Sequence, residues 1–166
     1  MLIVEDGTGT NESSNSYLDV ITADTLAETI LVDPNDWLSL DESQKERYLI
    51  LGTMFIDTYL NPTSYLLVDT QPLLWPREKF TDAQGREVEG IPSELEKATL
   101  TIATEFINED PFTQSISITE ERFGDSMQKF AAPIKENGFK ANLALQRLKN
   151  LGYGFSYSNT VKLVRA

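Results

Sequence analysis

The 166-residue sequence contains no cysteine and no histidine. The lack of cysteine excludes a disulfide framework, a thiolate nucleophile and a cysteine-based metal site. The lack of histidine removes the commonest metal ligand and the side chain best suited to proton transfer near neutral pH. No apolar run approaches the roughly 20 residues that span a bilayer, and the N-terminus has no basic-then-apolar signal pattern. We therefore expect a protein that stays in the cytoplasm or is assembled from it into a larger structure.

Recognisable catalytic and ligand-binding motifs are also missing. Gly7-Thr8-Gly9-Thr10 lacks the Gly-Lys-Ser/Thr ending of a phosphate loop and reads as a turn. Asp33-x-Asn35 lacks the further ligands and the glycine of a calcium loop. Ser13 and Ser14 have no histidine to activate them. The sequence therefore predicts a protein that is not an enzyme and that uses no cofactor or metal.

Acidic and basic residues are unevenly distributed along the chain. Residues 1–110 hold 6 Lys/Arg and 22 Asp/Glu, whereas residues 111–166 hold 8 and 4, so balances of −16 and +4 give the net −12. An acidic surface repels phosphate and opposes nucleic-acid binding, which depends on neutralising phosphates. A charge-segregated chain favours head-to-tail or heteromeric contacts, although acidic surfaces can also serve solubility alone.

The spacing of apolar residues predicts a mainly α fold. Three core helices are expected near residues 16–31, 42–60 and 92–109, with a fourth near 138–151. Ser16 with Asp19, and Ser39 with Glu42, are residue pairs typical of helix starts. The segment Asp33-Pro34-Asn35-Asp36 is expected to break the first helix.

Two further segments have the pattern of extended chain. Leu2-Ile3-Val4 indicates a short strand or an apolar plug, and strict alternation over 115–119 predicts a strand within a hairpin near 113–131. The fold class is therefore a small helical bundle with a β-hairpin and an extended C-terminal arm. We predict a helical core domain over 1–110. The hairpin, last helix and arm over 111–166 are either part of it or appended.

An apolar anchor lies at Leu73-Leu74-Trp75-Pro76-Arg77, followed by a polar turn with Gly85 and by Ile91-Pro92. Trp75 should be extended, because the proline ring disfavours the helical region for the preceding residue. Pro92 suits a first helical turn, where its missing N–H costs nothing. The simplest interpretation is a loop fixed by one buried aromatic side chain, and we expect Trp75 to be buried against the core.

Five motifs in order carry a resemblance to a known family. They are Val-Glu-Asp-Gly-Thr-Gly at 4–9, Asn-Ser-Tyr at 15–17, Phe-Ile-Asp at 55–57, Leu-x-Trp-Pro-Arg at 73–77 and Ile-Pro-x5-Ala at 91–98. Together they resemble small tailed-phage head–tail connector proteins, also called adaptor or head-completion proteins. Some of these are labelled DnaT-like single-stranded DNA-binding proteins. The resemblance covers residues 1–109, and the chain after Pro111 matches no motif of the family.

The resemblance implies a structural virion protein of a bacteriophage. Such connectors form rings, typically of about twelve copies, between portal and tail, and they complete the DNA-filled head. The implied partners are the portal protein, a tail or stopper protein and further copies of the chain. Double-stranded DNA passes through the ring transiently, and no membrane is involved. The implied location is the virion, and the host cytoplasm during assembly. A carboxylate-lined channel would let DNA slide, although the acidic residues suit an outer face equally well.

The basic C-terminal arm is the segment we assign to partner contact. Aromatic and apolar residues there resemble those of interface hot spots. The candidate partner-binding residues are Tyr153, Phe155, Tyr157, Val161, Leu163, Val164 and Arg165. The alternative is a strand that closes the domain's own core.

A second function from another class stays open, namely a single-stranded nucleic-acid-binding accessory protein. Such proteins combine cations with stacking aromatic side chains. Tyr153, Phe155 and Tyr157 beside Lys162 and Arg165 form the one such cluster in the sequence. The acidic balance of the whole chain favours the connector over this alternative.

Overall fold

The computed structural model describes residues 1–108 and 139–154. The hairpin predicted near 113–131 and the arm from residue 155 onward lie outside the described residues. The described part is mainly helical, as predicted, and its single sheet is a two-stranded antiparallel hairpin. The helices are α1 (Val20–Ile30), α2 (Asn35–Leu38), α3 (Glu42–Tyr59), α4 (Ser93–Asn108) and α5 (Phe139–Asn150), and the strands are β1 (Phe80–Thr81) and β2 (Glu87–Val88).

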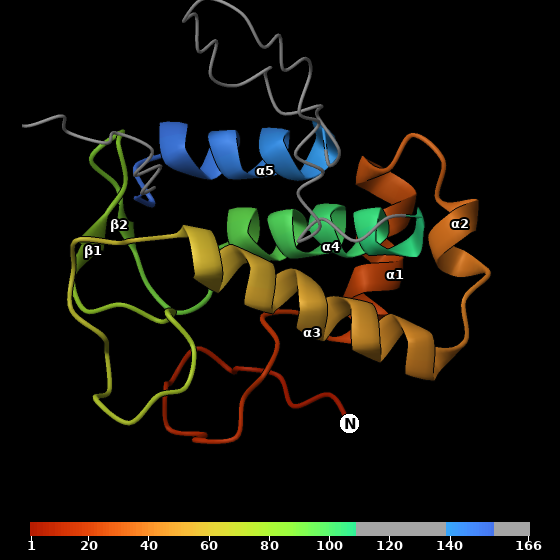
Figure 1. Ribbon diagram of the computed structural model, residues 1–166. Coiled ribbons are helices and arrows are strands. Elements are labelled where there is room, and N and C mark those ends of the chain that lie inside the picture. Colours follow the sequence, from red (N-terminus) through yellow and green to blue (C-terminus); the bar gives the residue numbers. More distant parts are fainter. Residues whose placement is uncertain (109–138, 155–166) are drawn as a thin grey trace, which may run out of the picture.

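Helix α4 occupies the middle of the bundle. In Figure 1, α3 and α5 run along α4 on different sides, and the hairpin lies at one end of the bundle with α2 at the other. Gly52 of α3 permits the close crossing with α4, because a Cβ there would lie 2.7 Å from the carbonyl oxygen of Thr99. The predicted helices over 92–109 and 138–151 are confirmed to within a residue at each end.

Two helix starts differ from the sequence prediction. Helix α1 begins at Val20, because Asp19 and not Ser16 accepts the hydrogen bond from the backbone N–H of Thr22. The Ser16 hydroxyl instead donates to the carbonyl of Leu18. Helix α3 begins with a capping box between Asp41 and Gln44, so Ser39 with Glu42 was the wrong pair. Polar side chains at neighbouring positions can each accept from the unpaired backbone N–H groups of the first helical turn. The direction in which the chain enters the helix decides which of them becomes the cap.

The short helix α2 begins within the segment Asp33–Asp36, which was predicted to break the first helix. Pro34 precedes it, and its carbonyl accepts from the backbone N–H of Leu38. Trp37 of α2 is fully buried and joins Leu18, Leu49 and Leu100 in one hydrophobic cluster. One buried tryptophan thus stabilises a single turn that has too few residues to be stable alone.

The polar turn expected after Trp75 is the tip of the hairpin. Phe80 pairs with Val88. The Asp82 carboxylate accepts hydrogen bonds from the backbone N–H groups of Gln84 and Arg86, which holds the pKa of Asp82 below its usual value. Gly85 has φ of 79°, a conformation that suits glycine. The two strands are too short to give a period-2 pattern, so the sequence indicated only a turn.

The loop between α3 and the hairpin is held by buried polar contacts. Arg77 donates to the carbonyls of Leu74 and Pro62 and to the hydroxyl of Ser64, so it joins both arms of the loop. Trp75 is 0% exposed, which confirms the predicted burial, and the Trp75–Pro76 peptide bond is cis. Trp75 belongs to a second hydrophobic cluster that includes Leu95 of α4 and Leu145 and Leu148 of α5.

Candidate functional site

Of the predicted partner-binding residues, the structure describes Tyr153. Its side chain is 4% exposed and packs against Trp75 and Phe80, with ring centroids 5.1 Å away in both cases. Tyr153 therefore belongs to the core, and its ring is not available to a partner in this arrangement. The other six, Phe155, Tyr157, Val161, Leu163, Val164 and Arg165, lie outside the described residues.

Gly154 fixes the position from which the C-terminal segment continues. Its carbonyl accepts a hydrogen bond from the backbone N–H of Asn61. A Cβ at this position would lie 2.3 Å from the carbonyl oxygen of Asn61, and φ is 78°, so the close approach requires glycine. The chain beyond Gly154 therefore starts at the end of α5 that lies beside the hairpin (Figure 1).

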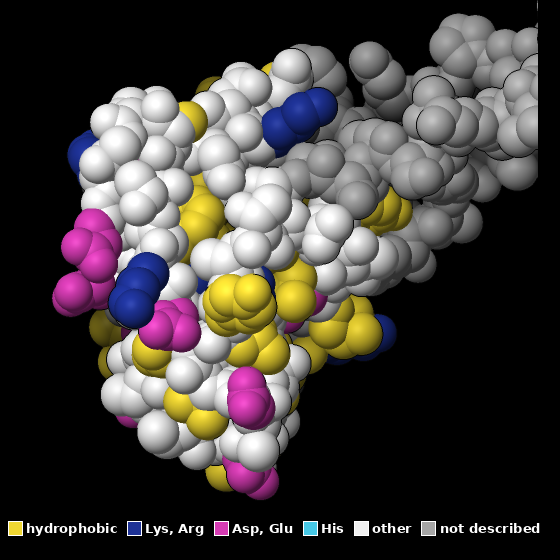
Figure 2. Space-filling model, turned by 90° about the vertical axis from the view of Figure 1, so that its left-hand side faces the viewer, with side chains coloured by type: hydrophobic (Ala, Val, Ile, Leu, Met, Phe, Trp, Pro, Cys, Tyr) yellow, Lys and Arg dark blue, Asp and Glu magenta, His cyan; other side chains and the backbone are white. Residues whose placement is uncertain are grey.

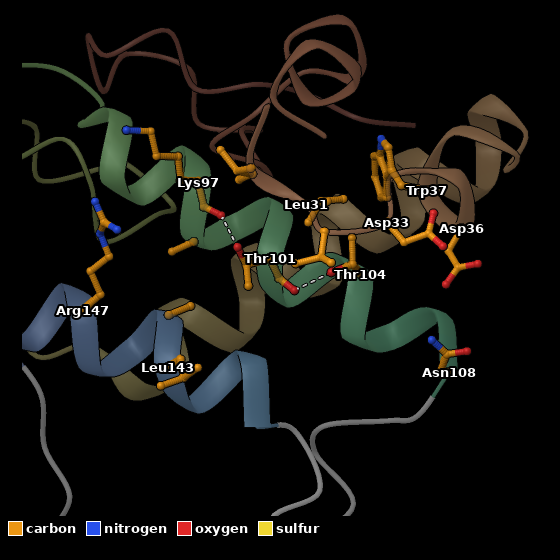
Figure 3. A pocket seen from close by; sticks show the side chains of 14 residues that line it. Leu31, Asp33, Asp36, Trp37, Lys97, Thr101, Thr104, Asn108, Leu143 and Arg147 are labelled. Atoms are coloured by element: carbon orange, nitrogen blue, oxygen red, sulfur yellow. Dashed lines mark hydrogen bonds between the residues drawn. The ribbon is translucent and has the colours of Figure 1, made fainter. Parts of the chain in front are cut away.

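A surface groove lies between α4, α5 and the segment that joins α1 to α2 (Figure 3). Its volume is about 750 Å³, within the range of ligand and peptide sites. The lining residues are Ile30, Leu31, Val32, Asp33, Asp36, Trp37, Lys97, Ala98, Thr101, Thr104, Asn108, Leu143, Ala144 and Arg147. We call this feature the α4–α5 groove.

The middle of the α4–α5 groove is apolar. Val32 is fully exposed at its rim, and Leu143 from α5 is 49% exposed. The hydroxyls of Thr101 and Thr104 donate to the carbonyls of Lys97 and Thr101 within α4, as the dashed lines in Figure 3 show. The hydroxyl protons are therefore already used, and the floor offers mainly methyl groups to an occupant.

The two ends of the α4–α5 groove carry opposite charges. At the α4 N-terminal end, Lys97 and Arg147 both bond the carboxylate of Glu94, at 2.9 and 2.6 Å. Burial opposes ionisation of Glu94, but the hydrogen bonds from both cations hold its pKa below the usual value. At the other end Asp33 and Asp36 are exposed, and within the described residues no ion pair to either is found.

The sequence prediction missed this groove. The first helix was predicted near residues 16–31, so Val32 was given no role. The available signal was a large aliphatic residue directly before Asp33-Pro34, where a loop would be expected to be polar. The contribution of α5 could not be read, because Leu143 and Ala98 are 45 positions apart in the chain.

A buried polar network links α3 to the Trp75 loop. The Tyr17 hydroxyl donates to Asp57 at 2.5 Å and accepts from the backbone N–H of Trp75 at 3.2 Å. The other oxygen of Asp57 accepts from the backbone N–H of Leu74 at 3.1 Å. Burial raises the pKa of Asp57 to about 6, despite these hydrogen bonds. Burial also raises the pKa of Tyr17 well above its usual value. The network joins residues of the Asn-Ser-Tyr, Phe-Ile-Asp and Leu-x-Trp-Pro-Arg motifs, so the structure brings these three motifs together.

The Val-Glu-Asp-Gly-Thr-Gly segment is a turn around a buried carboxylate, which agrees with the sequence interpretation. Glu5 accepts hydrogen bonds from the backbone N–H groups of Gly7 and Gly9, at 3.1 and 2.8 Å. A side chain at Gly9 would meet Gln71 at 2.9 Å, so the turn packs closely on the loop before Trp75. Within this turn, one carboxylate oxygen of Glu5 binds backbone N–H groups.

Within the described ranges no three or more acidic side chains come together as a possible metal site. Nor does any helix in those ranges have the length and apolar character that crossing a membrane requires.

The fold and groove define a small helical-bundle protein with an apolar surface groove and a basic outer helix. A family model described as "Putative DnaT-like ssDNA binding protein" matches residues 1–166, and the chain belongs to this family. No curated protein and no solved structure matches the chain. The family agrees with the DnaT-like label within the resemblance described above, and none of the comparisons concerns a virion connector.

Proposed function

We propose that this protein binds single-stranded nucleic acid as an accessory protein. The observation that carries the proposal is the match of the family model over all 166 residues, because its description names single-stranded DNA binding. From the sequence, the acidic balance of the whole chain favoured the connector over a binder of single-stranded nucleic acid. The family match now favours the binder.

The distribution of charge supports a binding site in the C-terminal part of the chain. Residues 1–108 hold 20 Asp/Glu and 6 Lys/Arg, and such a surface repels phosphate. Figure 2 shows acidic side chains spread over the described surface at the hairpin end of the molecule, with basic ones among them. Residues 137–166, in contrast, hold five Lys/Arg and no Asp/Glu. In α5, Arg147 and Lys149 from this set are exposed.

Aromatic residues of the same segment supply the second element of such a site. Single-strand binders stack bases on aromatic side chains, at about 1–3 kcal/mol per base. Because Tyr153 is buried in the core, we assign stacking to Phe155 and Tyr157, which are close in sequence to Lys162 and Arg165. The site is therefore proposed as α5 together with residues 155–166.

The test is fluorescence anisotropy of a labelled oligothymidylate titrated with the full chain at several salt concentrations. Affinity should fall with salt, because each neutralised phosphate releases counterions. Lys149→Gln should weaken binding about two- to threefold and lower the salt slope by about 0.7. Lys79→Gln is the matched control, because Lys79 is also exposed but lies in the acidic part. Its affinity should equal that of the wild type.

Two results would contradict the proposal. One is an absence of binding at low salt, and the other is an equal loss of affinity for Lys149→Gln and Lys79→Gln. Phe155→Ala with Tyr157→Ala separates stacking from charge, since it should weaken binding without a change in the salt slope.

The second candidate function is the ring-forming head–tail connector of a tailed phage. The acidic excess of residues 1–108 favours it, because a carboxylate-lined channel neutralises few phosphates and lets DNA slide. In this proposal the partners are the portal protein, a tail or stopper protein and about eleven further copies, and the place of action is the virion. Neither candidate function needs a catalytic centre, and we propose that the protein has none.

Mass determination separates the two candidates. A connector should form rings when mixed with portal protein, and deletion of residues 155–166 should abolish attachment of tails to filled heads. A binder of single strands should change mass on addition of an oligonucleotide and not on addition of portal protein.

A further inference from the structure

We propose that Glu94 competes with the backbone phosphate of a nucleic acid for Lys97 and Arg147, so that these cations form a phosphate site that stays closed until a strand displaces the carboxylate. This inference rests on the proposed function and deepens it, because it adds two cations and an internal competitor to the site. The side chains meet at the α4 N-terminal end of the groove, where Figure 3 shows Lys97 on α4 and Arg147 on α5.

One carboxylate holds both cations. Oε1 of Glu94 accepts from the Lys97 ammonium at 2.9 Å, and Oε2 accepts from Nε of Arg147 at 2.6 Å. Burial opposes ionisation of Glu94, but the hydrogen bonds from the two cations lower its pKa, so the carboxylate is charged at neutral pH. Two positive charges and one negative charge leave one net positive charge for a phosphate.

Arg147 keeps part of its guanidinium for a further anion. Arginine often binds a carboxylate through two parallel N–H groups, but here Glu94 is bound through Nε. Within residues 1–108 and 139–154 no bond to the two terminal nitrogens of Arg147 is found, and its side chain is 67% exposed. The side chain of Lys97 is 37% exposed. A phosphate oxygen can therefore approach both cations from solvent.

The way in which Glu94 is held favours a polymer over a free phosphate as the ligand. Ion pairs that are open to solvent add little stability, so an anion can displace the carboxylate. Because the fold keeps Glu94 beside both cations, its effective concentration there is high, and a free phosphate ion competes poorly. A phosphate of a strand that is already bound elsewhere on the protein also has a high effective concentration.

The closed site lies next to the point from which the proposed binding segment continues. Arg147 belongs to the last turn of α5, and Gly154 follows seven positions later. Burial raises the pKa of Tyr153, and the negative charge of Glu94 contributes to this shift, so Glu94 lies near the residue before Gly154. A strand bound by the segment that begins there is therefore close to Lys97 and Arg147.

The test is fluorescence anisotropy of the labelled oligothymidylate with the full chain, as wild type and as Glu94→Gln. Glutamine removes the charge and keeps the size, so affinity at low salt should rise about five- to tenfold and the salt slope should steepen by about 0.7. Glu89→Gln is the matched control, because Glu89 is exposed and no ion pair to it is found in the described part of the chain. It should change the affinity by less than about twofold.

A double-variant cycle identifies the cations. Arg147→Gln alone should change the affinity by less than about twofold, because in the wild type the contact with phosphate only replaces the contact with Glu94. In the Glu94→Gln background the same substitution should lower the affinity by about threefold or more. Additive effects would mean that Glu94 acts only as a general negative charge, and they would overturn the inference.

Inorganic phosphate tests the preference for a polymer. Compared with chloride at equal ionic strength, it should weaken oligonucleotide binding by Glu94→Gln at least about twofold and leave binding by the wild type unchanged. An equal loss in both proteins would contradict the role of Glu94 as a competitor.

The outcomes separate this inference from the proposed function. If the wild type binds and Glu94→Gln changes the affinity no more than Glu89→Gln does, the inference is overturned and the proposed function stands. If the wild type does not bind but Glu94→Gln binds in a salt-dependent way, the proposed function fails and the closed site is supported. Absence of binding in both proteins overturns both.

Arg147→Gln keeps the test decisive if circular dichroism shows that Glu94→Gln does not fold. In the wild-type background, a loss of affinity as large as that of Lys149→Gln would mean that the charge of Arg147 is not held by Glu94, and the inference would fail. A smaller loss than that of Lys149→Gln is the expected result.

Discussion

Trp37 and Trp75 are both fully buried, but they are held in different ways. Trp37 lies on α2, and its indole N–H donates to Asp24 of α1 at 2.8 Å. Asp24 also pairs with Lys45, which is itself buried. Trp75 lies on a loop, and its indole N–H has no hydrogen-bond partner. Instead, the backbone N–H of Trp75 is bound by Tyr17, which is 58 positions away.

The difference shows two ways of using one residue type. The Trp37 cluster is built from helices, and a polar side chain satisfies the polar atom of its tryptophan. The Trp75 cluster joins a loop and a hairpin to α3, α4 and α5, and there the structure satisfies the backbone N–H of the tryptophan and leaves its indole N–H unpaired. A loop without regular hydrogen bonds must find partners for its backbone groups elsewhere, and the Tyr17–Asp57 pair supplies them.

The largest expected effect is that of Trp75→Ala. This variant removes the side chain that contacts both Phe80 of the hairpin and Tyr153 after α5. Its free energy of unfolding in urea should fall by about 3–5 kcal/mol, as for other fully buried large side chains. A loss below about 1 kcal/mol would show that the loop can repack without its aromatic anchor.

The next effect is a dependence on pH that distinguishes the Trp75 region. The pKa of Asp57 is about 6 in the folded protein, above its usual 3.8, so the folded state binds this proton more tightly than the unfolded state does. Stability from this group is therefore present at low pH and is lost as pH rises from about 4 through 6. The loss should reach about 2–3 kcal/mol.

The measurement is urea unfolding of the wild type and of Asp57→Asn at several pH values. Asparagine cannot ionise, so the difference in free energy of unfolding should move by about 2–3 kcal/mol in favour of the variant between pH of about 4.5 and 7. Subtraction cancels the contributions of Asp19, Asp41 and Glu94, whose pKa values are lowered. A difference that is constant with pH would mean that Asp57 is solvated.

A smaller effect compares the two tryptophans directly. Trp37→Phe loses the hydrogen bond to Asp24, whereas Trp75→Phe loses no indole hydrogen bond. Trp37→Phe should therefore cost about 1 kcal/mol more than Trp75→Phe, because Asp24 loses one of its two partners. Equal costs in urea unfolding would show that the hydrogen bond at Trp37 contributes nothing net.

The smallest effect concerns the start of α3, close to the Trp37 cluster. Asp41→Ala removes the side chain that accepts from the backbone N–H of Gln44 and should cost about 1 kcal/mol. Ser39→Ala is the control, because its hydroxyl bonds the carbonyl of Asp36 and does not cap α3. It should cost less than about 0.5 kcal/mol. If Ser39→Ala lost more stability than Asp41→Ala in thermal unfolding, Ser39 would be the cap of α3, as the sequence suggested.

The sequence by itself determined the long helices, the burial of Trp75 and the charge difference between the two parts of the chain. The stripe of Leu95, Ala98 and Ile102 repeats at helical spacing, and a proline beside a tryptophan predicts an anchored loop. These features depend on residues within a few positions of one another. Helix propensity, proline geometry and net charge are properties of the local sequence, so they can be read without the fold.

Only the tertiary structure decided which cap is used, where the hairpin lies and how the groove forms. Strands β1 and β2 are two residues each and exist because Phe80 is held by Trp75 and Tyr153. The α4–α5 groove needs Val32 and Leu143 to line one cavity, and the raised pKa of Asp57 needs burial of its carboxyl group. Each depends on contacts between residues far apart in the chain, because burial and charge proximity are set by packing and not by sequence neighbours.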